Sequence, residues 1–320
     1  MWNKKQSLPM KIIERIILAI SLFFLISCNS PQNYLNDAVD ILKENSINKY
    51  SIDWEKLRNE VLEKGKKAKN IKETYPAIRF ALSQLGDHHS FLMTPEQGKS
   101  FNNPNLSIPN ISSELINNNI GYIKIPGFTG NRNERADKFA KNIQDKIREL
   151  DKNNIQFWIV DLGNDTGGNM WPMLLGLGPI LGNGIFGYFV DADKNYLNWG
   201  YSKGSVFYNN KQLMKLSNPY LLKNNIKKLA VIISKQTASS GEAIATSFKG
   251  AKNTYFIGKS TYGVSTGNSV FKLNDGAMIF LTTTKFADRN KNIYGVSINP
   301  DLEVFYLHAK ETAIEWIGEK

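Results

Sequence analysis

The sequence predicts an α/β protein with a small helical domain at its N-terminal end. Between Tyr34 and Leu85, apolar residues recur at helical spacing in an otherwise polar stretch. After residue 118, short apolar runs typical of strands alternate with helical patterns, as in a sheet whose strands are joined by crossover helices. The chain has 320 residues, of which 42% are hydrophobic and 22% charged, so it is long enough for this two-part organisation.

The first residues predict an export signal. A charged start at residues 10–15 precedes a weakly polar or apolar run at 16–26, which is too short to span a membrane but fits the core of a signal peptide. We therefore expect residues 1–27 to be a signal peptide, and Met10 is an alternative start because the nine residues before it add nothing to the signal.

The signal ends in Leu-Ile-Ser-Cys, which resembles the lipobox of bacterial lipoproteins, where cleavage precedes a cysteine that becomes lipid-modified. Lipidation of Cys28 predicts an extracytoplasmic protein anchored to the membrane of the bacterial cell envelope. The alternative is an incidental or buried cysteine. Because Cys28 is the only cysteine, an intrachain disulfide is excluded.

The charge of the chain argues against nucleic acid as a partner. The formal net charge is +11, and residues 1–27 hold four basic residues and one acidic residue, so the mature chain keeps +8. The basic residues are scattered rather than clustered with aromatic residues, which is typical of a solvated surface. An exported chain is also not expected to meet nucleic acid.

The helical domain is expected at residues 29–93 and the α/β core at 119–310. A connector rich in Asn, Pro and Ser separates them at 94–118, and residues 311–320 are expected to form a C-terminal tail. Residues 186–220 show weak periodicity and predict an excursion from the core that could cover a cleft. Strands of the core are expected at 120–125, 155–160, 229–233, 255–257 and 278–284.

Two loops that follow expected strands could carry chemistry. Residues 161–168 read Asp-Leu-Gly-Asn-Asp-Thr-Gly-Gly, and a glycine pair before a helix can present N–H groups to an oxyanion, or can simply make a tight turn. Residues 235–245 read KQTASSGEAIA, in which Ser239 is either a nucleophile or the first residue of a capping box that Glu242 closes.

A nucleophilic serine needs a base, and histidine is scarce in this chain. His88 and His89 lie together in GDHHSFL, whereas His308 lies in the closing segment and is expected to be structural. A histidine pair can instead bind metal, but the chain has neither an HExxH motif nor a cysteine nearby. We therefore expect no metal and no other cofactor.

Six motifs together carry a resemblance to a known family. They are GDHHSFL, GYIKIPGF, VDLGNDTGG, AVIISKQTASSGEAIA, GKSTYGVSTGN and YGVSINPD. Their order resembles that of the tail-specific, or carboxyl-terminal processing, serine proteases. The string GGNMWPMLLGLGPILGNG and the lack of room for a PDZ domain between His89 and Ile120 are most similar to the nisin-resistance-protein branch. The resemblance implies a crotonase-like or ClpP-like core of stacked β-β-α units beside a helical N-terminal domain.

The resemblance also implies roles for single residues. Ser239 falls on the nucleophile of the family, and Gly167, Gly168 and Ser240 fall where backbone N–H groups form the oxyanion hole. Relatives with a Ser-Lys dyad place the lysine where this chain has Val264, so the base is expected to be His89, as in the Ser-His branches.

Three positions depart from the family pattern or stay open. Gly163 and Asp165 stand where the family has arginine and asparagine, which alters the support of the glycine turn. Asp288 is a candidate for the acid that orients the histidine, and its alternative role is that of a turn aspartate.

The sequence as a whole therefore predicts a lipid-anchored serine peptidase that cleaves peptides or proteins near their C-terminus. Its expected partners are the C-terminal segments of peptides or proteins and, through the lipid, a membrane. Resistance to a nisin-like lantibiotic is a narrower hypothesis from the branch resemblance. The alternative is an envelope lipoprotein on the same fold that binds peptides without cutting them.

Overall fold

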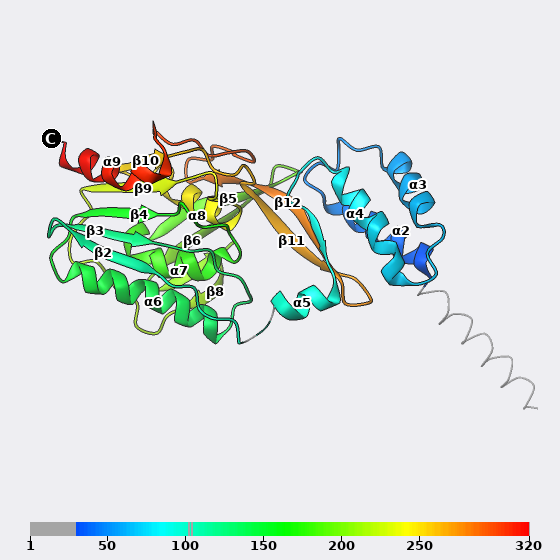
Figure 1. The fold of residues 1–320 in the computed structure, drawn as a ribbon, viewed down its shortest axis with the longest axis horizontal. Helices are drawn as coiled ribbons and strands as arrows, with labels where there is room; N and C mark the ends of the chain where they lie inside the picture. Colours follow the sequence, from blue (N-terminus) through cyan, green and yellow to red (C-terminus); the bar gives the residue numbers. More distant parts are fainter. Residues whose placement is uncertain (1–29, 102, 104, 320) are drawn as a thin grey trace, which may run out of the picture.

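A computed structural model describes residues 30–101, 103 and 105–319 of the chain (Figure 1). The predicted signal peptide and Cys28 lie outside the described residues. The helices are α2 (Pro31–Asn45), α3 (Trp54–Gly65), the 3-10 helix η1 (Ile71–Thr74), α4 (Tyr75–Ser83), α5 (Pro95–Phe101), α6 (Glu134–Asp151), α7 (Met170–Leu181), α8 (Ser240–Phe248) and α9 (Tyr306–Gly318). None of the helices in this part of the chain is long and apolar enough to cross a bilayer.

The strands of the described chain form two sheets. One has six strands in the order β13-β10-β9-β4-β3-β2, and the other has seven, in the order β1-β12-β5-β6-β7-β8 with β11 beside β12. The strands are β1 (Phe91–Met93), β2 (Ser112–Ile116), β3 (Ile120–Lys124), β4 (Phe157–Asp161), β5 (Gly184–Asp191), β6 (Tyr196–Ser202), β7 (Ser205–Tyr208), β8 (Lys211–Lys215), β9 (Lys228–Ile233), β10 (Thr254–Gly258), β11 (Thr266–Lys272), β12 (Met278–Asp288) and β13 (Leu302–Glu303).

The six-stranded sheet is the centre of the core. Strands β3, β4, β9 and β10 are parallel to one another, and only β2 runs antiparallel to its neighbour. Both faces are covered, because Val160 of β4 packs in the cluster with α6, α7 and α8, whereas Ile159 packs in the cluster with α9. Burial on both faces explains why these strands are continuous apolar runs. The predicted α/β class is confirmed.

The expectation that residues 311–320 form a C-terminal tail has to be corrected. Residues 311–318 belong to α9, which lies along one face of the six-stranded sheet, and Ala309, Ala313 and Ile317 are buried there (Figure 1). Their spacing of four residues places them on one side of the helix. The end of the core is therefore at least eight residues later than we expected.

The expectation that residues 186–220 form an excursion from the core also has to be corrected, because most of them form strands β5 to β8. These strands pair in antiparallel order, and Phe186, Trp199 and Tyr201 are buried in the main core cluster. Their aromatic rings need space, which Gly178 and Gly187 provide: a Cβ at either position would lie within 2.4 Å of a ring. Because these strands are stabilised by contacts with residues distant in sequence, their own sequence shows only weak periodicity.

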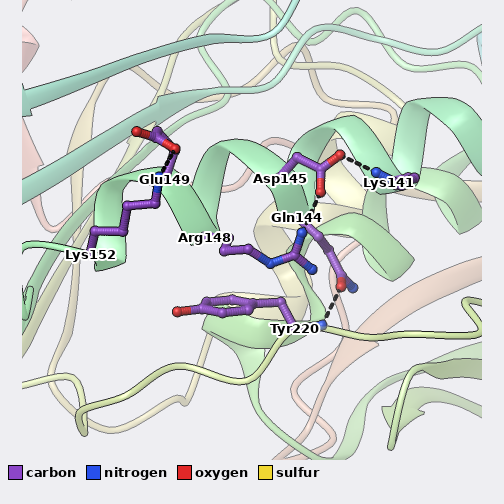
Figure 2. A network of polar contacts seen from close by, with 7 residues as sticks. All are labelled: Lys141, Gln144, Asp145, Arg148, Glu149, Lys152 and Tyr220. Atoms are coloured by element: carbon purple, nitrogen blue, oxygen red, sulfur yellow. Dashed lines mark hydrogen bonds and ion pairs between the residues drawn. The ribbon is translucent and has the colours of Figure 1, made fainter.

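The chain after β8 returns to the core along α6 (Figure 2). The buried amide of Gln144 accepts a bond from the Tyr220 N–H at 2.7 Å and donates to the carbonyl of Leu175 at 2.9 Å. Arg148, which is paired with Asp145, lies over the Tyr220 ring. A cavity of about 180 Å³ opens here, and no candidate site residue lines it.

The helical N-terminal part shares its core with a β-hairpin. Buried residues of α2, α3 and α4 pack against Leu273, Ile279 and Leu281 of the β11–β12 arm, which extends from the core towards these helices (Figure 1). Strand β1 also leaves the helical part and pairs with β12. The connector expected at 94–118 contains α5 and β2, so the two parts are joined by secondary structure rather than by a plain linker.

Asp275, in the β11–β12 turn, is expected to act as a clamp that holds the arm against the N-terminal helices. Its carboxylate accepts hydrogen bonds from the hydroxyls of Tyr34, at 2.8 Å, and Tyr75. Asp275→Ala leaves the hydroxyls of these two buried tyrosines without this acceptor and should lower the free energy of unfolding by about 1 to 3 kcal/mol, measured by urea denaturation. Glu149→Ala, which removes an exposed ion pair with Lys152, is the control and should cost less than about 1 kcal/mol. Equal losses in the two variants would contradict the clamp.

Candidate active site

The two predicted loops meet because their strands are neighbours. Ser239 follows β9, and the glycine turn follows β4, which pairs with β9 in parallel register. The carboxyl ends of parallel neighbours lie at one edge of a sheet, where α/β proteins commonly bind ligands. Both loops therefore emerge side by side from the same edge.

Ser239 has a backbone conformation that is rare for a side-chain-bearing residue. It stands at the N-cap of α8 with φ 53° and ψ −114°. Strained conformations of this kind persist where the surrounding structure enforces them, and they cluster at functional sites. A serine on a sharp strand-to-helix turn is also the arrangement of the nucleophile elbow. This conformation is unusual for a residue that only caps a helix, although Ser239 and Glu242 also form the expected capping box.

The buried side chain of Glu242 holds this strained turn in place. The Ser239 N–H donates to Glu242 Oε2 at 2.9 Å, which is the glutamate half of the expected capping box. The same fully buried carboxylate accepts bonds from the Thr261 hydroxyl at 2.6 Å and from the N–H groups of Gly263 and Val264 at 3.1 and 3.0 Å. Burial raises the pKa of Glu242, and these four hydrogen bonds oppose the rise. Glu242 thus ties α8 to the loop at 261–264.

The glycine turn packs directly on the serine. Gly167 and Gly168 have φ of 102° and 113°, so the turn needs glycine at both positions. A Cβ on Gly167 would lie 3.0 Å from the Ser239 Cβ and 3.2 Å from the Ser240 N. The Ser240 hydroxyl donates to the Gly168 carbonyl at 2.7 Å, which joins the two loops.

The two glycines expected at the oxyanion hole differ in the hydrogen bonding of their N–H groups. The Gly167 N–H donates to Asp165 Oδ1 at 2.9 Å and is therefore already used within the turn. Among the described residues, Gly168 and Ser240 keep their N–H groups out of the protein's own hydrogen bonds. Of the three N–H groups predicted for the oxyanion hole, these two are therefore the ones without a partner among the described residues.

His89 is held by the loop between α4 and β1. Asp87 accepts bonds from the N–H of His89 at 2.9 Å and of Ser90 at 2.7 Å. The ring Nδ1 of His89 lies 2.7 Å from the Thr266 hydroxyl. Burial lowers the pKa of His89, and Asp87 opposes this shift. By contrast, His88 and His308 are exposed.

Asp288 does not orient His89, and the alternative role as a turn aspartate holds. Its carboxylate accepts bonds from the N–H groups of Asn290 and Asn292 and from the Tyr294 hydroxyl at 3.0 Å. The hydrogen-bond partner of His89 Nδ1 is the Thr266 hydroxyl instead. Sequence reasoning missed Thr266 because nothing local marks it, although it lies only two residues after Val264.

Glu242 and Thr266 connect the serine and the histidine through one loop. Val264, whose N–H bonds to Glu242, also accepts a backbone bond from Thr266 at 2.7 Å. The path from Ser239 to His89 therefore runs through Glu242, Val264 and Thr266. The segment in which relatives carry a lysine here supplies the residue that holds the histidine.

Gly163 is explained by α9. A Cβ at this position would lie 2.0 Å from the ring of Tyr306, whose hydroxyl donates to Asp161 at 3.0 Å and to Asn164 at 2.8 Å. The absence of a side chain at 163 lets α9 approach the glycine turn. Tyr306 thus contacts the turn at the position where we expected its support to be altered.

Comparison with known proteins gives the class of this site. Residues 119–304, more than half of the chain, match the peptidase family S41. The chain belongs to peptidase family S41, which places it among the hydrolases, and the resemblance drawn from the six motifs is confirmed.

Three relatives illustrate the match. The nisin-resistance protein of Lactococcus lactis subsp. lactis is 32% identical over 289 residues, which cover 90% of this chain and 87% of the relative. The carboxy-terminal processing protease CtpA of Bacillus subtilis (strain 168) is 27% identical over 57% of this chain and 34% of its own length. The solved structure of a lipoprotein from Streptococcus agalactiae is similar with a TM-score of 0.75 and 25% identity, covering 90% of this chain and 96% of that one.

A more distant structure shows the fold alone. The photosystem II D1 C-terminal processing protease has a TM-score of 0.59 at 15% identity, over 87% of this chain and 94% of that one. The similarity to the nisin-resistance protein and to the two solved structures therefore covers 87 to 90% of this chain.

Gly167→Ala tests the packing of the glycine turn on Ser239. The added Cβ would lie 2.8 Å from the Ala238 carbonyl and 3.0 Å from the Ser239 Cβ, at a φ that disfavours alanine. We expect labelling of Ser239 by a fluorophosphonate to slow by about 100-fold, because displacements of about 1 Å at a reacting group cost this much.

The matched control is Gly182→Ala, which also has a positive φ but no atom within 4 Å of the added Cβ. It should label at close to the wild-type rate. Equal slowing in both variants would mean that backbone strain alone, and not contact with Ser239, is responsible.

Proposed function

We propose that this protein is an exported serine peptidase that cleaves peptides or proteins near their C-terminus with Ser239 as nucleophile and His89 as base. The observation that carries the proposal is the strained Ser239 at the start of α8, packed against a glycine turn. Membership of peptidase family S41 supports peptide or protein substrates. No metal or other cofactor is needed for this mechanism.

In the proposed reaction, His89 Nε2 accepts the proton of the Ser239 hydroxyl as the oxygen attacks the scissile carbonyl. The N–H groups of Gly168 and Ser240 then stabilise the oxyanion of the tetrahedral intermediate. His89 returns the proton to the leaving amine, and a water molecule releases the acyl group by the same steps. The position of Ser239 at a helix N-terminus favours the negative charge that develops.

Thr266 gives the histidine its role in this scheme. A base at Nε2 requires the tautomer in which Nδ1 carries the hydrogen, and Nδ1–H can then donate to the Thr266 hydroxyl at 2.7 Å. Val264 has no group that accepts a proton, so the lysine of a Ser-Lys dyad has no counterpart here. A hydroxyl in place of an acid suffices for orientation, although it stabilises the imidazolium less.

The relatives support a place in the cell envelope. One is named a nisin-resistance protein and another is described as a lipoprotein. We propose that the mature chain is anchored by lipid on Cys28 and that a nisin-like lantibiotic is one substrate, cut near its C-terminal end. If a susceptible strain gains no tolerance to the lantibiotic when it expresses the protein, the lantibiotic is excluded as a substrate. The general peptidase proposal would not be affected.

Ser239→Ala and His89→Ala test the dyad directly. Each should lower kcat for C-terminally varied peptides by on the order of 10⁴- to 10⁶-fold with little change in KM, as expected when a nucleophile or its base is lost. His88→Ala is the matched control, because the neighbouring ring is exposed and should be dispensable. Wild-type turnover in either test variant would exclude this mechanism, whereas peptide binding without turnover by the wild type would indicate a non-catalytic binding protein.

The acid side of the pH profile should report on His89. The base must be neutral, and burial lowers its pKa below the usual 6.5, so on the acid side kcat/KM should rise with pH through a value below 6.5. Thr266→Val removes the partner of Nδ1 and should lower kcat roughly fivefold, the equivalent of one hydrogen bond of about 1 kcal/mol. Thr266→Ser keeps the hydroxyl and should stay near wild type. A midpoint at or above 6.5 would argue against His89 as the titrating base.

A further inference from the structure

Asp165 lies between the two loops of the site. Its side chain is fully buried, and Oδ1 accepts the N–H of Gly167 at 2.9 Å. Its backbone carbonyl accepts the N–H of Ala238 at 2.9 Å, directly before the nucleophile. A Cβ on Gly241 would lie 2.9 Å from the Asp165 Cγ, so the carboxyl group also packs against the first turn of α8. One side chain therefore contacts the glycine turn and the helix that begins with Ser240.

The surroundings of Asp165 suit a neutral carboxyl group and not a carboxylate. Oδ2 is buried and has no hydrogen-bond partner among the described residues. A carboxylate that accepts a single N–H in such a place is strongly disfavoured, because burial removes the water that would solvate its charge. A protonated acid needs no compensating cation and resembles an asparagine side chain in size and shape.

Among the described residues, no positive charge acts on Asp165 to stabilise its ionised form. Asp161 at the end of β4 and Glu242 on α8 are acidic, and residues 125–129, which pass beside Gly167, carry no titratable side chain. Lys235, on the segment before Ser239, is exposed. In keeping with this, burial raises the pKa of Asp165 to about 8, and the Gly167 N–H opposes the rise only in part.

We propose that Asp165 is a positioning residue that works as a neutral acid, holding the Gly167 amide so that the Gly168 and Ser240 amides face the oxyanion, and that its ionisation switches the site off. The proposal rests on the proposed peptidase function. An ionised Asp165 would place a negative charge in a buried site where a second negative charge develops during the reaction, and like charges at low dielectric repel strongly.

The proposal predicts an alkaline limb in the pH profile that Asp165 controls. Above pH about 8, kcat/KM of the wild type should fall about tenfold per pH unit, as the protonated fraction does. Asp165→Asn keeps the neutral shape and should shift this limb upwards by at least one pH unit. Asp161→Asn, the same change in a neighbouring buried residue that accepts three hydrogen bonds, should leave the limb in place even if activity falls. An alkaline limb that is identical in the wild type and Asp165→Asn would overturn the proposal.

A second measurement does not depend on peptidase activity. The folded pKa lies above that of the unfolded chain, so protonation stabilises the fold at low pH, and this stabilisation is lost as pH rises through about 8. The melting temperature of the wild type should therefore fall relative to that of Asp165→Asn between pH 5 and pH about 8. A constant difference would contradict a neutral acid, whereas a changing difference in a protein without turnover would refute only the peptidase function.

Titration of the wild type by carboxyl ¹³C NMR decides the case even if Asp165→Asn fails to fold. With ¹³C-labelled aspartate, one carboxyl resonance should titrate near pH 8, and it should persist in Asp161→Asn. If every aspartate titrates below pH 6, Asp165 is ionised at neutral pH and the proposal is wrong.

Discussion

The buried carboxylate of Glu242 is the constraint on which the candidate site depends. Removing a carboxylate from water is costly, and here four donors offset that cost: the N–H groups of Ser239, Gly263 and Val264 and the hydroxyl of Thr261. Because the donors come from two separate segments, satisfying this one group fixes the nucleophile turn relative to the loop that leads to Thr266. A capping residue of a nine-residue helix thus organises contacts that extend to His89.

The two sheets make different contributions. The parallel sheet brings the turns after β4 and β9 to one edge, so Ser239, Gly168 and Ser240 meet through neighbouring strands and a short helix. His89 lies next to the other, seven-stranded sheet. In that sheet β1, which follows His89, pairs with β12, and Thr266 is the first residue of β11. The β11–β12 arm also completes the core of the N-terminal helices. The helical part is therefore not an appendage, because it positions the loop that carries the proposed base.

Two departures from the family pattern have physical explanations in this structure. Gly163 leaves space for Tyr306 of α9, whose hydroxyl bonds to Asp161 and Asn164 on either side of Gly163. Asp165 stands where the family pattern has asparagine, and a buried carboxyl group with one unpartnered oxygen and a raised pKa is chemically close to an amide. Both departures are therefore accommodated by their neighbours. Tyr306 of α9 packs against Gly163, and Gly241 of α8 packs against Asp165, so both helices contact the turn.

The sequence by itself determined the features that depend on short stretches of chain: the parallel strands as unbroken apolar runs, the glycine turn and Ser239 before a helix. These signals are local, since periodicity, glycine pairs and caps act over a few residues. Tertiary structure alone decided that Thr266 and not Asp288 contacts His89, that the Gly167 N–H is used by Asp165, and that residues 186–220 and 311–318 belong to the core. Each of these depends on partners distant in sequence or on the direction of a single N–H, and neither strand pairing nor the burial of a carboxyl group can be read from a stretch taken alone.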